Sequence, residues 1–369
     1  MNDANDSALQ VSPGCIAPEP PDITARVSNR RKSLSRGQYL DGIMAGDRMM
    51  LAQAITLTES SRPADRELAD QVVESCLRAG GNSLRVGITG VPGAGKSSLI
   101  EELGKFLIGE YGQKVAVLAV DPSSERTGGS ILGDKTRMTT LAASEMAFIR
   151  PSPSRGSFGG VAQRTREAML VCEAAGYRNI IVETVGVGQS ETAVHNMVDF
   201  FLLVTLAGAG DELQGIKRGV MELADLVAIN KADGQNVAAA ERAVTETNNA
   251  LHFLSGSPSG WTPRAMACSA RSGRGIAEIW KQVLDHAAMT RANGWFDQNR
   301  RDQRRRWMHE TLELGLRQFF TAHPLIRMRM ETLEREVLGG QTTPFRAART
   351  LLEMYSHLGS GGILHDEQP

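Results

Sequence analysis

The sequence has few cysteines and no long apolar segment. Its 369 residues include four cysteines, Cys15, Cys76, Cys172 and Cys268, which lie far apart and form neither a CxxC pair nor a Cys/His cluster. This spacing argues against a zinc site and a disulfide framework, and it favours a reducing compartment. No apolar run approaches the roughly 20 residues that a membrane-spanning helix needs. We therefore expect a cytoplasmic protein that does not span a membrane.

The sequence also has no excess of either charge. Its 41 basic and 42 acidic residues give a formal net charge of −1 at pH 7, so its overall charge does not attract nucleic acid or an anionic membrane. The arginine-rich stretch 300–306 is a local exception. It has no interleaved aromatic platform for bases, so we expect a solvated helix face or a contact to an acidic partner rather than a nucleic-acid site.

The composition changes along the chain. Residues 1–30 carry four prolines and several acidic residues without the apolar region of a signal peptide, which predicts a disordered leader. Residues 31–81 have helical spacing, in which Asp47 caps one helix and Pro63 starts the next. Residues 82–290 alternate seven continuous apolar runs with helices. Such runs are typical of strands in a parallel sheet that helices cover on both faces.

The last region, residues 291–369, is helical again. It contains three apolar stripes: Leu312, Leu316, Phe319 and Phe320; Ile326, Met330, Leu333 and Val337; and Phe345, Ala348, Leu352 and Tyr355. Apolar stripes of this length need to be buried. Docking on the α/β region and a self-complementary dimerisation arm fit them equally well.

A phosphate-binding loop opens the α/β region. The string GVPGAGKSS matches G-x-x-x-x-G-K-[ST] between a predicted strand and a predicted helix, and it comprises Gly90, Val91, Pro92, Gly93, Ala94, Gly95, Lys96, Ser97 and Ser98. Backbone N–H groups and the helix N-terminus of such a loop bind phosphate. We expect Lys96 to reach the β- and γ-phosphates and Ser97 to ligate Mg²⁺. The context predicts an α/β P-loop NTPase.

Two later loops indicate the base. Asp233, in the string NKAD, can accept hydrogen bonds from guanine N1–H and N2–H₂, whereas adenine offers a lone pair at N1. A buried carboxylate left unpaired by adenine costs several kcal/mol, so we expect GTP and GDP as ligands. Asn230 and Lys231 would tie this loop together and pack along the base. Ser269, Ala270 and Arg271 would support the base from the facing loop, through the Ala270 N–H.

A carboxylate ends one of the apolar runs. Glu183 lies in IIVETVGVGQSET, and a carboxylate at the end of a buried strand needs a partner. We expect that partner to be Mg²⁺, bound directly or through water. Gly186 can offer its N–H to the γ-phosphate and Gly188 can let the loop move when that phosphate leaves. Gln189 can help to place the attacking water, or it can be a surface residue.

Three further features suggest a nucleotide-dependent switch. Asp121 ends a strand in AVDPSS and can orient a metal-bound water, or it can cap the following turn. Asp134 lies in ERTGGSILGDKTRM and Lys217 lies in LAGAGDELQGIKRG, both polar glycine-rich loops. Several mobile loops around one γ-phosphate favour a switch whose state a partner reads over a simple hydrolase.

Together these strings resemble the MeaB/ArgK/MMAA GTPases, accessory proteins of adenosylcobalamin-dependent methylmalonyl-CoA mutase. The resemblance extends from about residue 35 to residue 355 and includes TGGSILGDKTRM and GAGDELQGIKRG. It implies the roles given above for the phosphate, metal, switch and guanine residues: Lys96, Ser97, Asp121, Asp134, Glu183, Lys217 and Asp233.

The resemblance also implies partners. It implies a homodimer held by the C-terminal helices and a GTP-gated role in delivering the cofactor to the mutase and in protecting or reactivating it. A cobalamin adenosyltransferase is a further candidate partner. The chain has no Asp-x-His-x-x-Gly motif, so we expect cobalamin to sit on the partners.

Two other functions fit the sequence less well. A nickel-insertion GTPase would need a metal-capturing Cys/His cluster, but the seven histidines are scattered. An ATP-dependent kinase of amino-acid transport conflicts with Asp233, which selects against adenine.

Overall fold

The computed structural model describes residues 34–60, 62–120, 138–151, 158–184, 190–208, 218–253 and 256–360. The chain divides into two units, Met1–Ser35 and Arg36–Pro369, and every helix and strand described below belongs to the second. In these described ranges no helix combines the length and the apolar character needed to cross a membrane.

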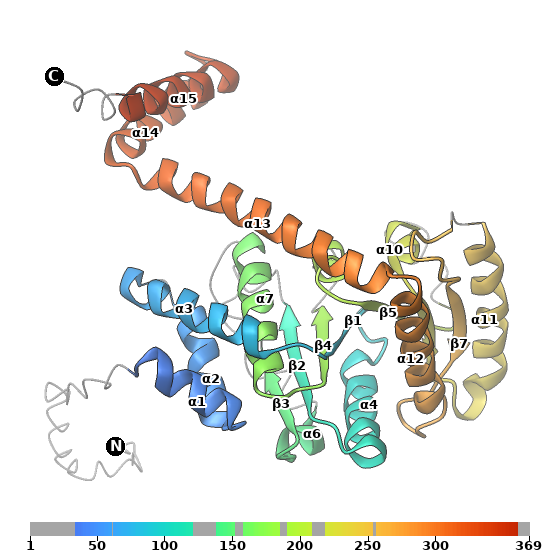
Figure 1. Cartoon of the computed structure of the whole chain (residues 1–369). Helices are drawn as coiled ribbons and strands as arrows, with labels where there is room; N and C mark the ends of the chain where they lie inside the picture. Colours follow the sequence, from blue (N-terminus) through green and yellow to red (C-terminus); the bar gives the residue numbers. More distant parts are fainter. Residues whose placement is uncertain are drawn as a thin grey trace, which may run out of the picture. The chain divides into compact units, whose positions relative to one another are not determined.

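A seven-stranded sheet forms the centre of this unit (Figure 1). Its strands are β1 (Leu84–Gly90), β2 (Val115–Val120), β3 (Ala147–Arg150), β4 (Asn179–Thr184), β5 (Phe200–Leu206), β6 (Leu226–Asn230) and β7 (Arg264–Ala267). The order is β3-β2-β4-β1-β5-β6-β7 and all six pairings are parallel. The predicted α/β fold is confirmed. Each of the seven apolar runs forms a strand because helices cover both of its faces.

Helices pack on both faces of the sheet. They are α4 (Lys96–Tyr111), α6 (Thr139–Ala143), α7 (Phe158–Ala174), α8 (Ser190–His195), α10 (Arg218–Leu223), α11 (Val237–His252) and α12 (Ile276–Ala292). On one face, α4 and α12 bury a large apolar cluster, which includes Leu103, Trp280 and Phe200. On the other, α11 covers β5–β7, and α8 contacts β1 and β4. The carboxyl ends of the strands therefore meet at one edge, where open α/β folds bind ligands.

Three helices precede the sheet: α1 (Arg36–Met44), α2 (Arg48–Thr58) and α3 (Pro63–Ala79). The expected cap is present, because Asp47 Oδ1 accepts a hydrogen bond of 2.7 Å from Met49 N. Pro63 is the first residue of α3, where its missing N–H costs nothing. These helices pack on one another and on α7.

Three helices follow the sheet: α13 (Trp295–Ala322), α14 (Pro324–Leu338) and α15 (Pro344–Ser360). Helix α13 packs against α12 and α7, and α14 packs against α15. Ile326 and Leu333 of α14 are buried with Ala347 and Leu351 of α15.

Most of the third predicted stripe is not covered within a single chain, although Tyr355 packs against the cluster between α14 and α15. On α15, Phe345, Ala348 and Leu352 are exposed, because α14 packs on the neighbouring face of the helix. On α13, Leu312, Leu316 and Phe319 of the first stripe are exposed as well.

Candidate functional site

Glycine geometry shapes the loop between β1 and α4. Gly90 has φ 152°, and a Cβ on it would lie 1.9 Å from the carbonyl oxygen of Val204 on β5. Gly95 has φ 87° and immediately precedes α4, and a Cβ there would lie 2.7 Å from Asn230 Nδ2. Only glycine fits both positions without displacing its neighbours. The loop can therefore follow the path that the sequence motif predicts.

Lys96 begins α4 and bends back over this loop. Its Nζ donates to the carbonyl oxygens of Gly90 at 2.9 Å and Val91 at 3.4 Å. The ammonium thus lies beside the N-terminus of a 16-residue helix, where the helix dipole is also positive. An anion placed there would interact with both charges and with the N–H groups of the first turn.

Ser97 and Glu183 meet although 86 positions separate them in the sequence. Ser97 Oγ donates to Glu183 Oε1 at 3.1 Å. Glu183 is the penultimate residue of β4 and only 3% exposed. Beside it, the hydroxyls of Thr89 and Thr184 join β1 to β4 at 2.8 Å. A hydroxyl and a carboxylate are hard oxygen donors, so this pair fits Mg²⁺ in chemical type.

The described residues do not complete a metal site by themselves. Within them, no group of three or more His, Cys, Asp or Glu side chains could hold an ion. This fits Mg²⁺, which usually keeps waters and binds substrate phosphates alongside one or two protein ligands. Burial raises the pKa of Cys76 to about 11 and that of Cys268 to about 12, so both thiols stay protonated.

Asn230 links the phosphate loop to the loop after β7. It is the last residue of β6 and is 3% exposed. Its Nδ2 donates to the carbonyl oxygen of Ala94 at 2.7 Å, and its Oδ1 accepts from Ala270 N at 3.1 Å. Asn230 thus joins the phosphate loop to the loop after β7. The Ala270 N–H, which was expected to support the base, is donated to Asn230 instead.

Asp233 is half-buried and is held by Ser269. The Ser269 hydroxyl donates to Asp233 Oδ2, and the same hydroxyl accepts from Ser272 N at 3.2 Å. Lys231 has φ 59°, a conformation that only glycines share with it among the described residues. Lys231 and Arg271 are both exposed beside these loops. The structure thus brings the NKAD and SAR strings together.

Five of the predicted site residues lie outside the described residues: Asp121, Asp134, Gly186, Gln189 and Lys217. Pro92, Gly93 and Ser98 are exposed at the phosphate loop, as a ligand-facing loop requires. Sequence reasoning missed the pair Thr89 and Thr184, because no local pattern predicts a contact between strands 95 positions apart.

Comparisons with known proteins decide the family. The family model described as "Methylmalonyl Co-A mutase-associated GTPase MeaB" matches residues 51–324. The chain belongs to the MeaB family of GTPases. It is 51% identical to a probable GTPase of Mycobacterium tuberculosis strain H37Rv over 85% of this chain and 93% of the relative. To the GTPase ArgK of Escherichia coli K12 it is 51% identical, over 78% of this chain and 87% of the relative.

More distant relatives agree. A mouse protein named "Methylmalonic aciduria type A homolog, mitochondrial" is 44% identical over 92% of this chain and 84% of its own length. A crystal structure described as a LAO/AO transport system kinase superposes with a TM-score of 0.69 at 40% identity, covering 87% of this chain and 97% of that one. As a MeaB-family protein the chain is a GTP hydrolase that binds guanine nucleotides. The nickel-insertion and kinase alternatives gain no support from this family.

Proposed function

We propose that this MeaB-family GTPase uses its nucleotide state to gate adenosylcobalamin delivery to methylmalonyl-CoA mutase, or a close relative, and to protect or reactivate that enzyme. The observation that carries the proposal is the family description, which names association with this mutase. The mouse relative named for methylmalonic aciduria supports it. We place the protein in the cytoplasm, and a cobalamin adenosyltransferase is a second partner to test.

The proposal gives residues of this chain the following roles within the GTP site. Lys96 balances charge on the β- and γ-phosphates, and Ser97 with Glu183 would hold Mg²⁺, which supplies charge neutralisation to the transferred phosphoryl group. Asp121 would orient a metal-bound water, and Gln189 is the proposed positioner of the attacking water. The switch loops would be those with Asp134, Gly186 and Lys217.

Guanine selectivity would reside in Asp233. Ser269 fixes one carboxylate oxygen, and this fixes the plane in which the carboxylate can receive guanine. Asn230 holds the phosphate loop and the SAR loop at a constant separation. Such positioning raises affinity because less loop ordering remains to be done when the nucleotide binds.

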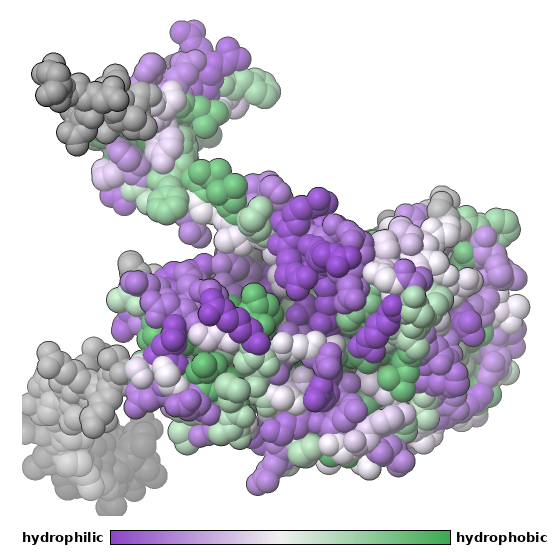
Figure 2. Space-filling view, viewed as in Figure 1, coloured by the Kyte–Doolittle hydropathy of each residue, from purple (hydrophilic) through white to green (hydrophobic). Residues whose placement is uncertain are grey.

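The C-terminal helices would form a homodimer. Large apolar side chains are exposed along them: Met308, Leu312, Leu316, Phe319, Leu325, Met328, Leu338, Phe345 and Leu352. Figure 2 shows hydrophilic residues over the first part of α13 and hydrophobic ones further along, toward α14. An apolar surface of this extent marks an interface, and a second copy of the arm would cover it.

The decisive experiment is GTP turnover by the purified protein, alone and with purified methylmalonyl-CoA mutase. We expect slow turnover alone and a severalfold increase with the mutase. ATP is the nucleotide control. Glu183→Ala should abolish turnover, whereas Glu102→Ala, on the exposed side of α4 where it pairs with Lys105, should not.

Other outcomes would redirect the proposal. Indifference to this mutase with a response to another acyl-CoA mutase would change the partner and keep the site. A response to nickel would support the metal-insertion alternative. Hydrolysis of ATP as fast as GTP would refute the role given to Asp233.

A further inference from the structure

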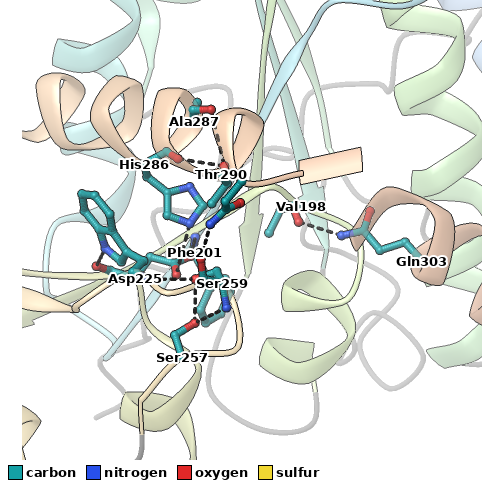
Figure 3. A network of polar contacts seen from close by, with 11 residues as sticks. Val198, Phe201, Asp225, Ser257, Ser259, His286, Ala287, Thr290 and Gln303 are labelled. Atoms are coloured by element: carbon teal, nitrogen blue, oxygen red, sulfur yellow. Dashed lines mark hydrogen bonds and ion pairs between the residues drawn. The ribbon is translucent and has the colours of Figure 1, made fainter. Parts of the chain in front are cut away.

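Helix α13 holds the short segment that connects α8 to β5. This connector comprises Asn196, Met197, Val198 and Asp199. Three of its four residues receive side chains from one face of α13. Arg300 binds Asp199, Gln303 Nε2 donates to the carbonyl oxygen of Val198 at 2.7 Å (Figure 3), and Trp307 Nε1 donates to that of Asn196 at 3.1 Å. The arginine-rich stretch was expected to be a solvated face or a contact to an acidic partner, but part of it lies against this connector.

Arg300 makes several hydrogen bonds to a buried carboxylate and a backbone carbonyl. Its guanidinium donates twice to the Asp199 carboxylate, at 2.7 and 2.8 Å, and once to the carbonyl oxygen of Ser83 at 2.8 Å. The same carboxylate accepts from Arg85 N at 2.9 Å, on β1. The Asp199 side chain is almost fully buried. Breaking a buried charge pair of this kind is costly, so Arg300 fixes α13 to the strand that leads into the phosphate loop.

The contact at Trp307 is of a different kind. Trp307 donates to the backbone of Asn196. Arg306, on the exposed side of the helix, donates to the side-chain oxygen of the same residue. Arg166 of α7 lies over the Trp307 ring at 5.3 Å and pairs with Glu310. Asn196 directly follows the last residue of α8. Trp307 therefore touches α7 and the connector that follows α8, and Arg85 of β1 lies over the same ring at 5.7 Å.

Helix α8 begins one residue after Gln189, so it continues the segment assigned to the γ-phosphate. We infer that α13 is a lever that couples the nucleotide state to the C-terminal helices, with its pivot at Arg300 and its input at Trp307. Trp307 and Arg306 are positioning residues in this view, because they act through α8. The inference rests on the proposed function and names its regulation: displacement of α8 moves the arm, and a partner on the arm alters the GTP site in return.

The length of α13 determines how much a displacement at Trp307 is amplified at the start of α14. At 1.5 Å per residue, Trp307 lies about 10 Å from the pivot and Ala322 about 33 Å. If α13 rotates as a rigid body, a shift of about 1 Å at Trp307 becomes about 3 Å where α14 begins. Small displacements at nucleotide sites are commonly amplified in this way, through packed elements with discrete arrangements.

The test uses the full chain labelled with 5-fluorotryptophan, which gives four indole resonances. GDP is compared with a non-hydrolysable GTP analogue, both with Mg²⁺, after calorimetry has established that each binds. We expect the Trp307 resonance to shift. The Trp261 resonance is the internal control, because its Nε1 is held by the carbonyl oxygen of Asp225 beside β6, and it should not shift.

A second measurement follows the output of the lever. Hydrogen exchange in α14 and α15 should differ between the two nucleotide states in the natural sequence. Trp307→Phe should reduce that difference at least twofold while GDP affinity stays within twofold. Trp295→Phe, at the start of α13, should leave the difference unchanged.

The outcomes separate the two proposals. Suppose that the GTP analogue binds and the mutase stimulates turnover. The lever is then refuted, and the proposed function stands, if the Trp307 resonance does not shift or if Trp307→Phe leaves the difference in hydrogen exchange of α14 and α15 unchanged. If the analogue does not bind, both are refuted. If Trp307 responds but the mutase has no effect, the lever stands with a different partner.

Discussion

Asn230→Ala tests whether the tie between two loops organises the GTP site. The substitution removes both hydrogen bonds of a side chain that is almost fully buried. The carbonyl oxygen of Ala94 and the N–H of Ala270 would lose their partner. An unsatisfied buried backbone group costs about 1–3 kcal/mol, so we expect the free energy of unfolding to fall by about 2–4 kcal/mol.

The same change should weaken nucleotide binding. Without the tie, the phosphate loop and the SAR loop must be ordered when GDP binds. If about 2 kcal/mol of that cost falls on binding, the Kd for GDP rises roughly 30-fold, since each 1.4 kcal/mol is a factor of ten. Urea unfolding gives the stability, and titration calorimetry with GDP gives the affinity.

Asn248→Ala is the matched control. Asn248 on α11 likewise makes two bonds to one strand, accepting from Ala265 N at 2.7 Å and donating to Ala265 O at 3.3 Å. That strand is β7, at its amino end, away from the nucleotide edge. Asn248→Ala should lower stability without changing GDP affinity. If Asn230→Ala also leaves GDP affinity unchanged, the tie does not organise the site.

Three further substitutions test other parts of the structure. Gly90→Ala places a Cβ 1.9 Å from a β5 carbonyl oxygen and should cost more than about 4 kcal/mol of stability or prevent folding. Gly109→Ala, in open space within α4, should instead raise the thermal unfolding temperature. Ser97→Ala should make GDP affinity independent of Mg²⁺, as measured by calorimetry with and without EDTA. Ser98→Ala is the control and should keep the Mg²⁺ dependence. If Ser98→Ala loses it as well, the loss reflects a collapsed phosphate loop rather than a missing Mg²⁺ ligand. Burial raises the pKa of Asp225 from 3.8 to about 7, so between these values this carboxyl binds more protons in the native state and its own contribution to stability falls as pH rises. Burial lowers the pKa of His286, 3.7 Å away, to about 4, and this contribution changes with pH in the opposite direction. In urea titrations from pH 4 to pH 7, the stability of the natural protein relative to Asp225→Asn should therefore fall as pH rises, and a difference that stays constant with pH would contradict the raised pKa of Asp225.

Some features were predictable because the residues that encode them are adjacent. The apolar runs became strands, Asp47 became a cap and GVPGAGKSS became a loop between β1 and α4. A strand followed by a glycine-rich loop and a helix needs only local conformational preferences and one buried side.

Other features depended on distant partners. The stretch 300–306 has the composition of a solvated face, yet Arg300 is fixed by Asp199, which lies 101 positions away. The stripe containing Phe345 and Leu352 has the spacing of a buried face, yet α14 packs on the adjacent one. The sequence predicts that the Ala270 N–H supports the base, yet this group donates to Asn230 Oδ1.

The sequence by itself therefore determined the parallel sheet and the place of the phosphate loop between β1 and α4, because periodicity and motifs act over a few neighbouring residues. Only the tertiary structure decided that Ser97 meets Glu183, that Asn230 joins two loops and that α13 holds the end of α8. The bonds between Ser97 and Glu183, Asn230 and Ala94, and Trp307 and Asn196 join residues 86, 136 and 111 positions apart, and such pairing is set by how whole helices and strands pack rather than by any local pattern.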